Sequence, residues 1–357
     1  MRRALVIALA AGVVAPAGAQ AKPHPQPLVD AVPLGTQFKD RVFWSAKSTA
    51  SAAASPAFAA YPTADGTVVN VAISDAYAGQ LDQTVAQSYV DFLQSLDHGP
   101  ELATLQVVIA PPSEVLATCG GQEGTLACYN VATSVMYLPG EPVTTPSGVT
   151  TSYIAAHEYG HHIAANRSNP PFDAFAFGPK YWASYKLVCN RALRGLLAPG
   201  DEDQFYALNP GEGWAETYAQ LKYPEVDWAS TPFTPLLQPD QGAFDAARRD
   251  VHTPWTQEVT QVFNGNFGRT GSDSRHFNFP LTLDGPLSVR LTGPRKSDYN
   301  LVIKSEAGGH GTTKRRGSHD GLSYEAACRE KASEQLTVAV KRVKGSGPFT
   351  VRVRYPG

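Results

Sequence analysis

The chain changes its apolar periodicity near residue 265, and this change most strongly limits the folds that it can adopt. Upstream, apolar residues recur at helical spacing in several stretches, whereas downstream they alternate with polar residues. Alternation with period two predicts strands that bury one face, and Gly and Pro separate these runs. The alternating positions are Phe277, Phe279, Leu281, Leu283, Leu287, Val289, Leu291, Leu336, Val338, Val340, Phe349, Val351, Val353 and Tyr355. We therefore expect an α+β chain, with a mixed domain over residues 67–253, a linker over 254–264 and a small all-β sandwich over 265–357.

The N-terminus resembles an export signal. Two arginines precede the apolar run from Ala4 to Val14, and Ala17-Gly18-Ala19 fits a cleavage site, with Ala19-Gln20-Ala21 as a second choice. Residues 1–19 are therefore expected to be a signal peptide, which makes the protein secreted. Residues 20–66 are rich in Ala, Ser and Pro and predict a leader or linker with little structure of its own, which could include a short propeptide.

Charge and cysteine content narrow the class of protein further. A net charge of −2 gives no indication of nucleic-acid binding, and no later segment is long enough to span a membrane. Export permits disulfides, and the chain has four cysteines. The short separation of Cys119 and Cys128 favours a local bridge, which would leave Cys189 and Cys328 to pair across the two domains. The alternative is that these last two are free, buried thiols.

The run His157-Glu158-Tyr159-Gly160-His161 is the strongest chemical motif. Residues 148–165 predict one helix with Ser147 as its N-cap, and two histidines four apart on a helix face the same way. Both imidazoles can then bind one zinc ion. Glu158, about 100° round the helix, can take a proton from water at that zinc. The alternative is a core helix whose histidines are satisfied by hydrogen bonds.

A second segment offers the third ligand that a catalytic zinc site needs. Glu212 and Glu216 are four apart in the run from Asn209 to Ala219, so they share a helix face. One carboxylate can bind zinc and the other can orient a ligand histidine. The alternative is a capped surface helix with two solvated acids.

These two segments together resemble the gluzincin branch of zinc metallopeptidases. The form Glu212-Gly-Trp-Ala-Glu216-Thr-Tyr218 is closer to the lethal-factor type than to the thermolysin type. The resemblance implies a zincin-like domain in which His157, His161 and Glu212 bind zinc. It further implies that Glu158 is the general base and that Glu216 supports the site.

The chain departs from the thermolysin-like pattern in its spacing, because fifty residues lie between His161 and Glu212. Such enzymes often carry an electrophilic tyrosine just before the glutamate helix, and Tyr206 is the candidate here, six residues before Glu212. Farther on, residues 298–303 and the closing strand resemble the β-sandwich modules of secreted bacterial peptidases, the pre-peptidase C-terminal type.

The expected function is that of a secreted zinc metalloendopeptidase acting on protein or peptide substrates. We expect the segment from Cys128 to Leu138 to pair with an extended substrate, although an ordinary sheet strand is the equal alternative. Two other functions remain: a zinc amidase acting on cell-wall linkages, and a non-enzymatic binding protein in which zinc only holds the fold. A fourth protein ligand on the zinc would favour the last of these.

Overall fold

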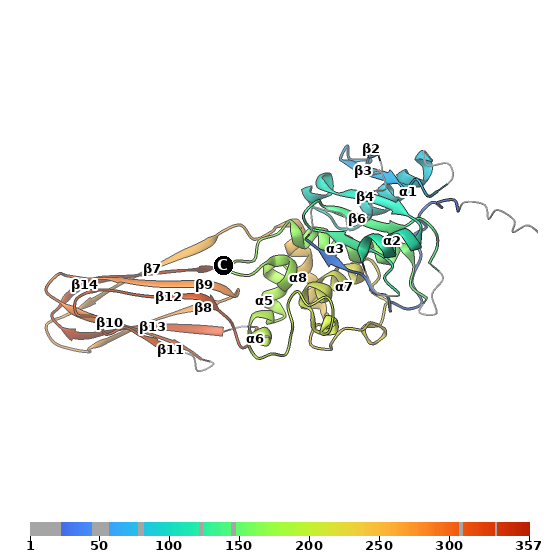
Figure 1. Cartoon of the computed structure of the whole chain (residues 1–357). Coiled ribbons are helices and arrows are strands. Elements are labelled where there is room, and N and C mark those ends of the chain that lie inside the picture. Colours follow the sequence, from blue (N-terminus) through green and yellow to red (C-terminus); the bar gives the residue numbers. More distant parts are fainter. Residues whose placement is uncertain are drawn as a thin grey trace, which may run out of the picture.

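The computed structural model describes residues 23–44, 57–77, 82–120, 124–143, 148–306, 310–332 and 334–357. The expected signal peptide lies outside these residues. Within them the chain is mixed α/β and ends in a β-sandwich, which extends away from the helical part in Figure 1. No helix in the described ranges is long and apolar enough to cross a membrane.

The N-terminal part is built on a six-stranded mixed sheet. Its order is β1 (Val42–Phe43), β5 (Cys128–Asn130), β6 (Val135–Pro139), β4 (Gln106–Ala110), β3 (Val68–Ile73) and β2 (Ala59–Pro62). The central strands β6, β4 and β3 are parallel, and most of their residues are apolar and buried, as expected for strands covered on both faces.

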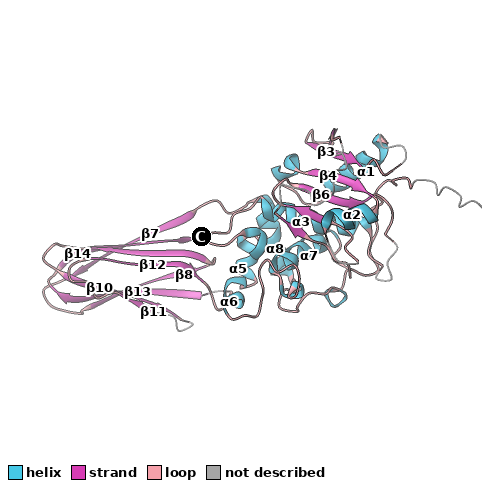
Figure 2. Cartoon of the chain, viewed as in Figure 1, coloured by secondary structure: helices cyan, strands magenta, loops and turns pink. Residues whose placement is uncertain are grey.

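Eight helices accompany this sheet among the described residues. In Figure 2, α1, α2 and α3 lie by the sheet, whereas α5, α6 and α8 lie between it and the sandwich. They are α1 (Gln83–Gln94), α2 (Pro112–Cys119), α3 (Thr151–Ala165), α4 (Ala174–Phe177), α5 (Lys180–Tyr185), α6 (Val188–Leu193), α7 (Pro210–Lys222) and α8 (Gln241–His252), with short 3₁₀ turns η1 (Pro100–Thr104), η2 (Tyr206–Leu208) and η3 (Trp228–Ser230).

The helix of the histidine motif, α3, begins later than the sequence pattern predicts. Thr150 is its N-cap and accepts a hydrogen bond from Tyr153 N, whereas Gly148 has a φ of 69° and cannot belong to the helix. The expected cap, Ser147, lies outside the described residues. Almost all of α3 is buried, so its polar side chains must find partners inside the protein.

Helices α3 and α7 cross at close range because Gly160 has no side chain. A Cβ added to Gly160 would lie 2.8 Å from Cα of Ala215, closer than real Cβ atoms approach. Trp214 of α7 donates a hydrogen bond from Nε1 to the carbonyl of Gly160, 2.8 Å away. This crossing brings the histidine helix and the glutamate helix into direct contact.

The sequence predicts a leader or linker with little structure of its own over residues 20–66. This prediction is wrong for the parts of that range that the structure describes. Residues 23–44 lie against the N-terminal part, and β1 and β2 are the two outer strands of its sheet. From Thr36 to Val42 every second residue is buried, which is the pattern of an extended segment with one face inward. The Ala- and Ser-rich composition of the neighbouring residues 45–60 led the prediction to overlook this pattern. Residues 45–56 lie outside the described residues.

The C-terminal part consists of two four-stranded sheets that face each other. One sheet has the order β11 (His310–Thr312), β10 (Asp298–Ser305), β13 (Glu334–Lys344) and β8 (Ser274–Leu281); the other has β12 (His319–Ala327), β9 (Gly285–Thr292), β14 (Gly347–Pro356) and β7 (Glu258–Phe267). The alternating residues of the sequence pattern form its core. The linker expected over 254–264 is partly wrong, because β7 begins at Glu258 and pairs along β14.

Both expected disulfides are confirmed, Cys119–Cys128 and Cys189–Cys328. The second joins α6 to the sandwich. Beside it Arg329 forms a buried ion pair with Asp284, and Lys180 of α5 donates a hydrogen bond to the Asp284 carbonyl at 2.9 Å. The two parts of the chain are therefore connected covalently and by buried polar contacts.

Candidate metal centre

Four buried side chains converge on one point between α3, α7 and the N-terminal segment: Asp40, His157, His161 and Glu212. One ligand atom from each lies within 4.8 Å of the others. Helix α3 presents both histidines on one face, and the first turn of α7 presents Glu212 toward them, as the sequence predicts. Asn209 fixes the start of α7 by accepting a hydrogen bond from Gly211 N.

The spacing of these atoms fits a tetrahedral metal ion. Nε2 of His157 lies 3.2 Å from Oε2 of Glu212, and Nε2 of His161 lies 3.4 Å from Oε1 of Glu212. Oδ2 of Asp40 lies 3.6 Å from Nε2 of His157 and 3.1 Å from Nε2 of His161. Ligand atoms about 2.0–2.1 Å from a tetrahedral zinc would be roughly 3.3 Å apart. Two imidazoles and two carboxylates are also a donor set that divalent metals accept.

Asp40 is the member of this group that the sequence analysis missed. It belongs to the extended segment before β1, where no metal-binding spacing marks it. The only available signal was the alternation of Phe38, Asp40 and Val42 with exposed residues, which places an acid on the buried face of a strand. An acid at such a position needs a partner.

Glu216 lies behind the ligands rather than among them. Its Oε2 is 3.1 Å from Nδ1 of His157, on the ring side opposite to Nε2, and its Oε1 accepts a 2.5 Å hydrogen bond from the hydroxyl of Tyr153. This contact fixes the His157 tautomer that carries its proton on Nδ1 and leaves Nε2 free to bind a metal.

Glu158 is fully buried, and neither of its carboxylate oxygens has a hydrogen-bond partner among the described residues. Burial, and then the negative charge of Asp40, raises the pKa of Glu158 well above its usual value. An unsatisfied carboxyl in a core is costly and rare. A cation beside it would favour its ionised form, so this residue also argues for a metal at the centre.

The histidine pKa values respond to the surrounding carboxylates. Burial opposes a charge on either ring, but hydrogen bonds to Asp40, Glu212 and Glu216 hold the pKa of His157 well above its usual value. The Glu212 charge and the Asp40 hydrogen bond raise the pKa of His161 to about 10 despite burial. Positive charge is thus favoured at this point, and a divalent ion would supply it with both rings neutral.

Tyr206 and Glu202 approach the group from the loop before α7. The Tyr206 hydroxyl donates a 2.5 Å hydrogen bond to Oδ1 of Asp40. Glu202 accepts hydrogen bonds from Val42 N at 3.2 Å and from Asn209 Nδ2 at 2.9 Å. Burial, reinforced by the charges of Glu212 and Asp40, raises the pKa of Glu202 to about 9. Tyr206 therefore lies beside the group, and its hydroxyl is engaged by Asp40.

His162 is not part of the group. Its Nδ1 lies 2.9 Å from the Tyr129 hydroxyl and its Nε2 lies 2.9 Å from the carbonyl of Glu101. Burial lowers its pKa below the usual value. It acts as a hydrogen-bonded core residue.

The group of Asp40, His157, His161 and Glu212, which we call the metal group, is closed to large molecules in this structure. Asp40, His157, His161, Glu158 and Glu212 are all buried. A small cavity of about 60 Å³ lies beside the group and is lined by residues that include Asp40, Glu202 and Tyr206. This volume accommodates a few water molecules but no peptide.

Comparisons with known proteins leave the family open. No family model matches the chain, and no curated protein matches it. Among solved structures, the pre-peptidase C-terminal domain of a Bacillus anthracis collagenase is 12% identical over 27% of this chain and 89% of that chain, with a TM-score of 0.23. A mitogen from Yersinia pseudotuberculosis is 16% identical over 27% of this chain and 86% of that chain, with a TM-score of 0.21. These scores are too low to support an argument about function.

Proposed function

We propose that this protein is a secreted zinc metallopeptidase of the gluzincin type, with a pre-peptidase C-terminal-like sandwich. The observation that carries the proposal is the pairing of a buried group of four candidate ligand atoms with a buried carboxyl, Glu158, that has no hydrogen-bond donor in the described residues. A site that only holds a fold needs ligands but no base. The two disulfides are consistent with an oxidising, extracellular location.

Each residue has a chemical role in this proposal. Zinc, when bound, polarises the scissile carbonyl and makes water acidic near neutral pH. Glu158 accepts the proton of the attacking water and then delivers it to the leaving amine. Glu216 holds the ring of His157 in orientation. The Tyr206 hydroxyl, once it no longer donates to Asp40, can donate to the oxyanion of the substrate.

One observation favours a second function. Asp40 supplies a fourth protein ligand, and a sphere closed by four protein ligands is typical of structural zinc. In that case the protein would be a zinc-stabilised binding protein. The unsatisfied Glu158 and the Tyr206 hydroxyl directed at the group have no purpose in such a site, and we therefore prefer the peptidase.

The test uses a chain from which Asp40, the fourth candidate metal ligand, has been removed. Both the bound metal and the cleavage of a substrate are measured. Asp40→Ala is measured beside the unchanged chain for bound metal by mass spectrometry and for chelator-sensitive cleavage of labelled casein. The double variant Asp40→Ala, Glu158→Gln is the matched control. We expect one zinc per chain and cleavage that depends on Glu158. Digestion of peptidoglycan without cleavage of casein would instead identify the zinc amidase, and no hydrolysis of either would identify the structural site.

A further inference from the structure

We propose that residues Thr36–Trp44 are a built-in inhibitor: Asp40 occupies the metal's substrate position and the flanking backbone occupies the sheet edge where a peptide substrate would pair. This inference rests on the proposed peptidase function and adds its regulation. It also defines the substrate groove as the space that this segment fills.

The first argument is the way Asp40 reaches the metal group. His157, His161 and Glu212 come from two long helices that cross directly, whereas Asp40 comes from a segment whose only regular structure is the two-residue strand β1. Three ligands on rigid helices can hold zinc without the fourth, as catalytic zinc sites do. The fourth position, where water or substrate binds in such sites, is here filled by Asp40.

The second argument is the backbone pairing of the segment. Without β1, strand β5 would be the edge strand of the sheet. The segment runs parallel to β5 and covers the side of β5 that would otherwise have free backbone hydrogen-bonding groups. Leu126 N, Tyr129 N and Val131 N donate to the carbonyls of Lys39, Arg41 and Phe43 at 3.0–3.1 Å. A peptide held by strand addition would need these same donors. Substrate and segment therefore exclude each other along β5 as well as at the metal.

The third argument is the conformation of the segment. Thr36, Phe38, Asp40 and Val42 point inward while the residues between them do not, which is how an extended peptide lies in a groove. Phe38 packs edge-on against the ring of His157 at a centroid distance of 5.1 Å. The inward side chains thus fill positions on both sides of the metal group.

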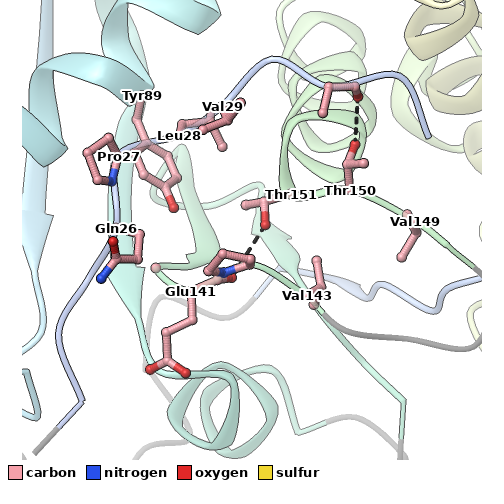
Figure 3. A pocket seen from close by; sticks show the side chains of 13 residues that line it. Gln26, Pro27, Leu28, Val29, Tyr89, Glu141, Val143, Val149, Thr150 and Thr151 are labelled. Atoms are coloured by element: carbon pink, nitrogen blue, oxygen red, sulfur yellow. Dashed lines mark hydrogen bonds between the residues drawn. The ribbon is translucent and has the colours of Figure 1, made fainter.

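The fourth argument is that the approach to the segment is partly exposed, although Asp30 within it forms an ion pair with Lys222 at 2.9 Å. Residues 26–35 run over the start of α3 through a few polar contacts, such as Leu34 N to the Gly148 carbonyl at 3.0 Å and the Thr150 hydroxyl to the Ala31 carbonyl at 3.1 Å. Leu34 is 95% exposed and Val29 is 70% exposed. Figure 3 shows Gln26, Leu28 and Val29 on one side of a cavity of about 160 Å³ and Thr150 and Thr151 on the other. The side chains of Val29 and Leu34 therefore bury little apolar surface that would oppose displacement of this stretch.

The test measures access to the metal separately from catalysis. Full-length chain, Asp40→Ala and Val42→Asp are loaded with cobalt(II), and binding of acetohydroxamate is followed by the visible absorption of the metal. Val42→Asp introduces a charge at a buried position of β1 and leaves all four candidate ligands intact. Val32→Asp and Asp245→Ala are the controls, since both positions are exposed.

We expect both test variants to bind acetohydroxamate more tightly and to cleave casein faster than the unchanged chain, while the controls behave like it. A segment that is closed in 99 of 100 molecules lowers apparent affinity about 100-fold. We also expect Asp40→Ala to keep its metal. If Val42→Asp does not fold, Asp40→Ala alone decides.

The outcomes separate the two proposals. Tighter acetohydroxamate binding without cleavage of any substrate would support the inhibitor-like segment and overturn the peptidase. Equal cleavage by the unchanged chain and both variants would overturn the inhibitor and leave the peptidase standing. Loss of metal and of thermal stability in Asp40→Ala, with no gain in binding or cleavage, would make Asp40 a structural ligand and overturn this inference.

Discussion

Nδ1 of His157 lies 3.1 Å from Oε2 of Glu216, on the ring edge turned away from the metal group. The contact lets Glu216 orient the His157 ring, whereas Glu212, one turn earlier in α7, is the candidate metal ligand. Two glutamates that the sequence pattern leaves nearly equivalent are thereby given different tasks, and this difference can be measured.

Glu212→Ala should abolish tight metal binding, because it removes one of the atoms that face the metal. Glu216→Ala should weaken metal binding only about 10–100-fold, the usual effect of losing a partner that orients a histidine. Titration with a competing chelator measures both, and Glu225→Ala, an exposed glutamate after α7, is the control. The opposite ranking would reverse the two roles.

Glu158→Gln should keep the metal and the fold, because the amide has nearly the same shape and the carboxyl makes no hydrogen bond to a described residue. Cleavage by the chain carrying Asp40→Ala should fall by roughly 10² or more when this second change is added, because the proton acceptor is gone. Steady-state rates on a short peptide, normalised to bound zinc, measure the effect. Rates within a few-fold of each other would exclude Glu158 as the base.

Gly160→Ala should separate α3 from α7, because the new Cβ would lie 2.8 Å from Cα of Ala215. We expect a loss of about 1–3 kcal/mol in the free energy of unfolding, typical of overpacking, together with weaker metal binding. Gly321→Ala in strand β12 is the control, since a Cβ there meets no atom closer than 3.5 Å. Chemical denaturation should separate the two variants, and equal stability would mean that the helices adjust freely.

Asp250 should make stability depend on pH. It accepts backbone hydrogen bonds from Tyr181 N and Trp182 N at the start of α5, and burial raises its pKa to about 7 despite them. Between its unfolded pKa of about 4 and pH 7 the folded chain retains a proton that the unfolded chain releases. The folded state therefore loses stability as pH rises through this window.

Asp250→Asn removes this titration. The stability advantage of the unchanged chain over Asp250→Asn should shrink between pH 4 and pH 7, by on the order of 1–4 kcal/mol. Denaturant unfolding at several pH values measures it. Parallel stability curves for the two chains would show that Asp250 does not titrate in this range.

The two disulfides should differ in their contribution to stability. Cys119–Cys128 spans 9 residues and Cys189–Cys328 spans 139. On the loop-entropy estimate their removal costs roughly 3 and roughly 5 kcal/mol. Paired Cys→Ser variants, compared by denaturant unfolding, test this order. A larger loss from the short bridge would show that local geometry at α2 outweighs chain entropy.

The sequence by itself determined the features that depend on local spacing. The four-residue interval between His157 and His161 places both rings on one helix face whatever the rest of the chain does. The same interval pairs Glu212 with Glu216. Period-two alternation after residue 265 similarly specified the sandwich core, because each strand must bury one face.

Only the tertiary structure decided which residues from other parts of the sequence lie beside α3 and α7 at the site. Asp40 lies more than a hundred residues before His157, and its place in the group depends on the pairing of the Thr36–Trp44 segment with β5. The close crossing at Gly160 and Ala215 likewise exists only when α3 and α7 meet. Sequence spacing specifies directions within one element, whereas contacts between elements depend on how the whole core packs. For this reason the candidate metal ligands on α3 and α7 could be predicted, and Asp40 could not.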